Sequence, residues 1–278
     1  MIFRKISATE KIYIETKSRY ESVYSDFENF AHQLTLEAGN SKKSSGKASS
    51  YARYVIRLII FYEEIFAESI DPLVSFDAVK KLERVSQHED FKSYNRTEKH
   101  FPSASIGCFR AYIVSKNTEQ EEYEDFQLNL ELYREEVLSD KQKALVNGPK
   151  KKSVKKQNAV GTSYPRNVVE SVEAKKRANY MCEISDGHQT FINAADHQKF
   201  IEAHHLIPMA AQDYFDYTID FADNIVTLCP TCHRQIHYAV PEQKAELVEM
   251  LFKKRQGNYG KYGIEIDIAR LKNFYGLL

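Results

Sequence analysis

Several features are scarce or missing in this chain of 278 residues. It has no tryptophan, only four cysteines and no run of 18 apolar residues. A helix that spans a bilayer needs about 20 predominantly apolar residues, so we expect no membrane partner. Four cysteines are too few for a disulfide scaffold, and the N-terminal residues lack the apolar stretch of a secretory signal. The sequence therefore predicts a cytoplasmic protein.

The chain also lacks net charge, with 39 basic and 39 acidic residues. Such a balance argues against nucleic acid as a partner only if the charge is evenly spread. It is not, because residues 141–165 hold seven basic and no acidic side chains, whereas residues 118–140 hold nine acidic and one basic. Neutrality results from opposing local blocks, and nucleic acid stays open as a partner.

Two halves of different character lie on either side of a basic stretch. Apolar side chains recur at helical spacing in residues 51–66, which predicts a helix with one buried face. Ser75 is the expected N-cap of a further helix. Residues 147–165 combine glycine, proline and lysine without apolar periodicity, as is typical of linkers. We therefore expect a helical domain over 1–146, a linker over 147–165 and a second domain over 166–278.

The second domain differs from the first in its pattern and in its histidines and cysteines. Residues 197–208 read as a short extended segment, residues 224–229 as a strand, and Pro230 starts a predicted helix. Most of the histidines and three of the four cysteines fall between Cys182 and His237. Clustering of these residue types indicates metal binding.

Three histidines have the spacing of a catalytic metal site. His233 and His237 are four residues apart, so on a helix they project from the same face, one turn apart. His204 is the expected third ligand. Neighbouring side chains of a strand point to opposite sides, so His205 can face a substrate water while His204 binds the metal. Three protein ligands leave one coordination position open, which is the pattern of catalytic sites.

Together these segments resemble the HNH, or ββα-metal, nucleases, both colicin nuclease domains and the HNH domains of restriction enzymes that cut modified DNA. The residues that carry the resemblance are Glu202, His204, His205, Asn224, Cys229, Cys232, His233 and His237. It implies an α+β fold, with an all-helical first domain followed by a β-hairpin and a helix that hold the metal between them. It also implies that His204, His233 and His237 are the metal ligands.

The same resemblance assigns roles to the residues around the metal. His205 becomes the general base, and Asn224 ties the loop and orients His205. Glu202 is expected to hydrogen-bond a ligand histidine or a nearby arginine. One divalent cation is implied: three imidazoles suit Zn, Ni, Co or Mn better than Mg, although substrate phosphate can supply the oxygens that Mg prefers. We expect hydrolysis of double-stranded DNA, in restriction or antiphage defence.

The cysteines indicate a second, separate metal site. Cys229 and Cys232 form half of a zinc knuckle, but Ser185 stands where the other half would pair with Cys182. His188 lies three residues further, a variant that occurs among relatives of this nuclease group. The resemblance therefore implies a closed structural zinc site of three thiols and one imidazole. The alternative is that the thiols are simply small buried residues.

Other functions compete with an active restriction nuclease. One is a zinc-stabilised DNA-binding module whose nuclease centre is vestigial, and another is a toxin or mobile-element nuclease with little sequence preference. The helical half also has two interpretations. Residues 45–113 resemble the core-binding domain of tyrosine recombinases, which would imply a DNA clamp, whereas a plain helical domain would serve a homodimer or a defence-system partner. The presence of His205 with its three ligand histidines favours activity.

Overall fold

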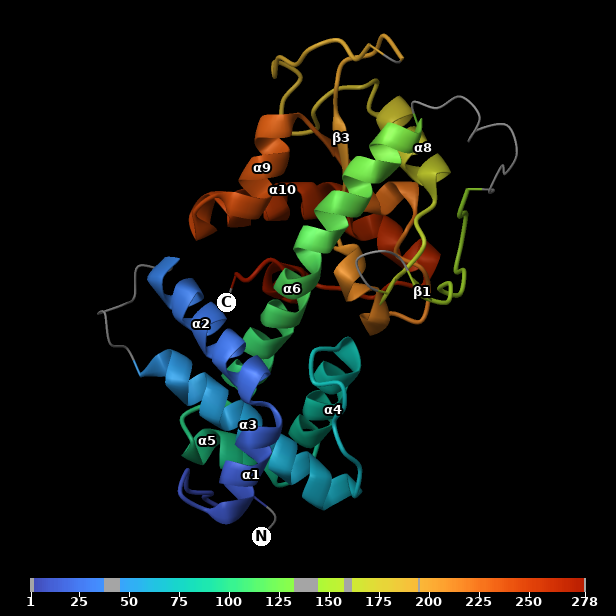
Figure 1. The fold of residues 1–278 in the computed structure, drawn as a ribbon. Coiled ribbons are helices and arrows are strands. Elements are labelled where there is room, and N and C mark those ends of the chain that lie inside the picture. Colours follow the sequence, from blue (N-terminus) through green and yellow to red (C-terminus); the bar gives the residue numbers. More distant parts are fainter. Residues whose placement is uncertain (1–2, 38–45, 133–144, 158–161, 195, 278) are drawn as a thin grey trace. The chain divides into compact units, whose positions relative to one another are not determined.

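The computed structural model describes residues 3–37, 46–132, 145–157, 162–194 and 196–277. The chain divides into two compact units, residues 1–115 and 116–277 (Figure 1). Within the described residues the first unit is helical, and the second combines helices with two short antiparallel sheets. This confirms the predicted α+β class. Among the described helices, none has the length and apolar character needed to cross a membrane.

A central helix organises the first unit, and other helices of this unit pack against it. The helix predicted over residues 51–66 is present. Burial extends beyond the one predicted face, because Ile56, Ile60 and Phe61 are each at most 1% exposed. The buried face is therefore broad, although Arg53 stays exposed to solvent. Ser75 caps the next helix as predicted, accepting a hydrogen bond from Ala78 N at 3.1 Å. The helices are α1 (Lys11–Arg19), α2 (Glu21–Glu37), the central α3 (Lys47–Phe66), α4 (Phe76–Ser86), α5 (Phe91–Thr97) and α6 (Phe101–Leu132), which continues into the second unit.

A β-hairpin followed by a helix lies at the centre of the second unit. Strands β3 (Glu202–His205) and β4 (Ile225–Leu228) pair antiparallel, with His204 opposite Val226. Cys229 alone separates β4 from helix α9 (Pro230–Tyr238), and the proline at its first position suits a helix start. The other elements are β1 (Lys156–Gln157), β2 (Thr162–Ser163), α8 (Val168–Arg177), η1 (Met209–Tyr214), η2 (Ala222–Asn224), α10 (Pro241–Tyr259), η3 (Gly260–Tyr262) and α11 (Ile268–Phe274).

The long connection between the two strands is held closed by Asn224. Its Oδ1 accepts from Ile207 N at 2.9 Å, and its Nδ2 donates to Ile207 O at 3.1 Å and to Ile219 O at 2.8 Å. Tyr259 of α10 adds a hydrogen bond to the same Oδ1 at 3.2 Å. The Asn224 side chain is fully buried, so these hydrogen bonds replace those that its amide would otherwise make to water. One residue thereby fixes both ends of the loop that follows β3.

The basic stretch, expected as a linker, is attached to the second unit along part of its length. Thr218 N donates to Lys150 O at 2.8 Å, and Lys152 N donates to Asp216 O at 3.3 Å. Lys151 forms an isolated antiparallel bridge with Tyr217. Backbone pairing has no side-chain signature, so the composition alone could not indicate it. The assignment of 147–165 as a linker between domains 1–146 and 166–278 stays a prediction.

Candidate metal centres

The three predicted ligand histidines converge. His204 comes from β3, and His233 and His237 come from one face of α9. One ligand nitrogen from each ring lies within 4.8 Å of the others. The strand and the helix are joined by the hairpin, which brings residues far apart in sequence to one point. The spacing allows all three imidazoles to share a single cation.

Hydrogen bonds fix which nitrogen of His233 is available. Its Nδ1 lies 2.9 Å from Glu202 Oε2. Burial opposes ionisation of Glu202, but the bond with His233 outweighs it and lowers the pKa of the carboxyl. An ionised carboxylate only accepts, so His233 donates from Nδ1 and keeps its lone pair on Nε2. That Nε2 lies 3.3 Å from Nε2 of His237, which is the arrangement expected around a shared ligand.

Two histidines of this cluster, His204 and His237, have lowered pKa values and are neutral, as metal ligands must be. Burial lowers the pKa of His237 to about 3. Burial and the neighbouring His237 also lower the pKa of His204 well below its usual value. Neutral imidazoles carry a lone pair, and three of them fit Zn, Ni, Co or Mn. The donor set therefore fits a transition-metal ion.

Tyr275, at the end of α11, orients the third ligand. Its Oη donates to Leu206 O at 2.9 Å and lies 2.8 Å from His204 Nε2. Because the single hydroxyl proton goes to the carbonyl, Oη accepts from Nε2–H, which leaves Nδ1 of His204 for the cation. A bond of this kind fixes both the tautomer and the ring orientation of a metal ligand.

Replacing Tyr275 by phenylalanine should weaken binding of the catalytic cation by about 10- to 100-fold, the usual cost of losing such a partner. Calorimetric titration with Mn²⁺ or Co²⁺ measures the affinity directly. Tyr238→Phe, an exposed tyrosine on α9, is the matched control and should bind as the parent does. Equal affinities for the two variants would show that Tyr275 does not orient His204.

His205 lies next to the cluster but has different partners. Its Nε2 is 3.0 Å from Asp220 Oδ1, and its Nδ1 is 3.1 Å from Arg166 Nη1. A guanidinium can only donate, so Nδ1 accepts and the proton sits on Nε2, donated to Asp220. Asp220 is itself fixed by Asn167 N, which donates to Oδ2 at 2.5 Å. His205 is therefore held in one tautomer with the lone pair on Nδ1.

Glu202 and Asn224 differ in whether they contact a histidine of the site directly. Glu202 contacts a ligand histidine directly, through His233. Asn224 ties the loop through hydrogen bonds to the loop backbone, and it also accepts one from Tyr259. Any orienting effect on His205 is therefore indirect, through the loop that follows the strand. The direct partners of His205 are Asp220 and Arg166.

Three further residues of the site have no signal in the sequence: Arg166, Asp220 and Tyr275. They lie 39, 15 and 71 residues from the histidines that they contact. None stands in a repeated spacing, and each is a residue type common on any protein surface. Only the fold brings them to the site.

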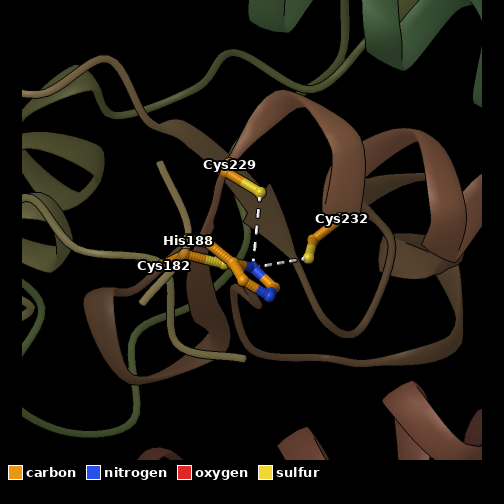
Figure 2. Close-up of side chains that lie close together, drawn as sticks. All are labelled: Cys182, His188, Cys229 and Cys232. Carbon is orange, nitrogen blue, oxygen red and sulfur yellow. Dashed lines mark hydrogen bonds between the residues drawn. The ribbon is translucent and has the colours of Figure 1, made fainter. Parts of the chain in front are cut away.

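The second cluster joins Cys182, His188, Cys229 and Cys232, whose ligand atoms lie within 4.8 Å of one another (Figure 2). His188 Nδ1 is 3.3 Å from Cys232 Sγ and 3.6 Å from Cys229 Sγ. The three thiols are buried and form no disulfide. One imidazole and three sulfurs at this separation are a four-ligand set of the kind that can bind structural zinc.

The thiol environment fits a cation. Burial opposes ionisation of Cys182, yet the backbone amides of Cys229 and Ile184 and the His188 ring outweigh it and lower the pKa of this thiol to about 7. For Cys232, burial and the neighbouring sulfurs raise the pKa. Negative charge on one sulfur therefore opposes ionisation of the neighbouring thiol. A bound divalent cation relieves this repulsion and holds thiolates ionised.

Comparison with known proteins agrees with the geometry. Residues 189–239 match the family of HNH endonucleases. The chain carries an HNH domain. It is 40% identical over 57 residues to the type IV methyl-directed restriction enzyme EcoKMcrA of Escherichia coli K12, a match that covers 20% of this chain and 18% of that enzyme. The chain thus spans less than a fifth of the length of that relative. No solved structure matches this chain.

The HNH match includes the predicted histidines 204, 205, 233 and 237 but excludes several partners described above. Arg166, Cys182 and Tyr275 lie outside residues 189–239. The two candidate metal centres therefore include residues from flanking segments of the second unit. A fragment limited to the matched residues would lack two of the four ligands of the Cys/His cluster, Cys182 and His188, and the hydroxyl beside His204.

Proposed function

We propose that the chain is a metal-dependent endonuclease that hydrolyses phosphodiester bonds of double-stranded DNA. The observation that carries this proposal is the convergence of three imidazoles next to His205, whose tautomer is set by Asp220. The cluster supplies ligands with an open position, and His205 supplies an acceptor for a proton. An HNH domain and similarity to a restriction enzyme support the same reaction class.

In the proposed reaction His205 is the general base. Its Nδ1 takes the proton of a water that attacks phosphorus, while Nε2–H stays donated to Asp220 and stabilises the imidazolium that forms. Arg166, which donates to Nδ1 without substrate, turns to a phosphate oxygen when the water arrives. The bond from phosphorus to the leaving 3′ oxygen then breaks. A divalent cation held by His204, His233 and His237 would supply Lewis-acid stabilisation of the developing negative charge.

Cleavage of supercoiled plasmid should require an added divalent cation. Three imidazole ligands predict that Mn, Ni, Co or Zn supports the reaction at least as well as Mg. Gel electrophoresis of plasmid incubated with each metal, and with EDTA, measures the nicked and linear products. An intact plasmid with every cation would contradict the proposal and favour a DNA-binding module with a vestigial centre.

The setting that we propose is restriction or other antiphage defence. Support comes from the methyl-directed restriction enzyme that the HNH segment resembles. The plasmid assay separates this role from its rival when plain, methylated and hydroxymethylated DNA are compared in parallel. Preference for one modification supports restriction, whereas equal cutting of all three favours a toxin or mobile-element nuclease.

We also infer a division of labour along the chain. The helical domain, assigned to 1–146, would recognise DNA or dock a defence-system partner, and residues 166–278 would cut. The aromatic side chains of α3 are mostly buried, so they build the core of the first unit rather than a base-stacking surface. Recognition by this domain would therefore use its exposed polar residues.

A further inference from the structure

Residues 150–156, here called the lysine strap, lie on the surface of the second unit. Two backbone hydrogen bonds fix the strap, from Thr218 N to Lys150 O at 2.8 Å and from Lys152 N to Asp216 O at 3.3 Å. Its end pairs with β2, where Lys156 lies opposite Ser163. The strap therefore has a defined path, unlike a tether whose backbone is solvated.

The strap presents positive charge to solvent. Lys150, Lys151, Lys155 and Lys156 are exposed, and no acidic residue lies within 141–165. Lys155 is paired with Asp213 at 2.5 Å, and the ammonium of Lys151 lies 4.8 Å from the centre of the Tyr217 ring. The nearby Asp213 is thus already occupied by a strap lysine and by Tyr164, which donates to its other oxygen at 2.5 Å.

The strap leads to the proposed general base. From Ser163, opposite Lys156, the chain continues through Tyr164 to Arg166, which contacts His205. Three residues of extended chain span at most about 10 Å. Successive charges on one DNA strand are about 3.4 Å apart along the axis, so the end of the strap lies within a few base steps of the reaction centre. The segment 213–220, whose backbone bonds the strap, also leads to the proposed general base, because it ends at Asp220, the partner of His205.

We propose that the lysine strap binds the phosphate backbone of duplex DNA beside the scissile phosphate. This proposal rests on the proposed function, because the reacting phosphate sets the position of the duplex. Lysines contact phosphates as point charges and read no bases, so the strap would strengthen binding to every sequence equally. A backbone already fixed on the domain loses little further freedom when DNA binds.

The test neutralises three strap lysines, Lys150, Lys151 and Lys156, together as glutamines. The control replaces three exposed lysines of the same unit, Lys176, Lys253 and Lys261, in the same way. Both sets are placed in a His205→Ala background, so that DNA is bound but not cut. Fluorescence anisotropy with a short duplex gives the affinity from about 50 to about 200 mM salt. A third set, with the strap lysines replaced by arginine, keeps the charge.

Each lost phosphate contact should reduce the slope of log affinity against log salt by about 0.9, so the strap variant should lose up to about 2.7. The control and arginine variants should retain the parental slope. In the active protein, the strap variant should raise KM and leave kcat unchanged, as loss of uniform binding predicts. A strap variant with the slope of the control overturns the proposal, and so does a parent that binds no duplex.

The outcomes separate this proposal from the proposed function. If the parent cuts DNA but the strap variant has the parental salt slope, the proposal for the strap is wrong and the proposed nuclease activity stands. If the strap variant has a reduced salt slope but the parent cuts no DNA with any metal, the strap binds duplex DNA and the proposed nuclease activity is wrong.

Discussion

Replacing His205 by alanine is expected to lower the rate of DNA cleavage by about 10²- to 10⁴-fold, the usual contribution of a general base. His205 is buried, and its Nε2 proton is donated to Asp220, so Nδ1 is the acceptor left for a water proton. The ligand nitrogens belong to other residues, and the cation should therefore still bind. Single-turnover cleavage measures the loss in the chemical step.

A matched variant makes this result specific. His197 is an exposed histidine of the same HNH segment, and His197→Ala should cut DNA at the parental rate. Equal cation affinity of His205→Ala and the parent, measured by titration, would show that the cluster is intact. If His205→Ala cuts as fast as the parent, another group must take the proton and the proposed mechanism is wrong.

The parts of the site that the sequence predicted share a property: their spacing along the chain directly encodes their geometry. Two histidines four residues apart on a helix face one way wherever the helix lies, and adjacent histidines on a strand diverge. His233, His237, His204 and His205 follow these rules in the structure. The Cys-x-x-Cys pair at the start of α9 does too, because the same turn presents both sulfurs to one point.

The partners that the sequence did not predict are positioned by tertiary structure. Tyr275 reaches His204 only because α11 folds back on α10, a packing that no local pattern announces. Asp220 depends on the closure of the loop by Asn224, whose carboxamide bonds the backbone on both sides. Burial around α3 likewise exceeds the single face predicted, because helices pack against it from several sides. Contacts of this kind follow from the whole fold.

Replacing Cys229 by serine should remove one zinc per chain and unfold the HNH part of the second unit. Structural zinc contributes about 10–16 kcal/mol in small zinc-finger peptides, which is comparable to the entire stability of about 5–15 kcal/mol for an ordinary domain. Cys229 directly precedes α9, and Cys232 adjoins the ligand His233, so loss of this zinc should also disorder the catalytic cluster. Metal analysis and thermal unfolding measure the two effects.

Two controls distinguish the zinc centre from the catalytic one. His233→Ala should retain this zinc, because His233 belongs to the other cluster, and Cys108→Ser should retain it because Cys108 is buried in the first unit. Purified parental protein that is folded and free of zinc would refute the assignment. Because α9 carries ligands of both clusters, we also expect an order of loss: a chelator strong enough to extract the zinc should abolish cation binding at His204, whereas removal of the catalytic cation should leave the zinc in place.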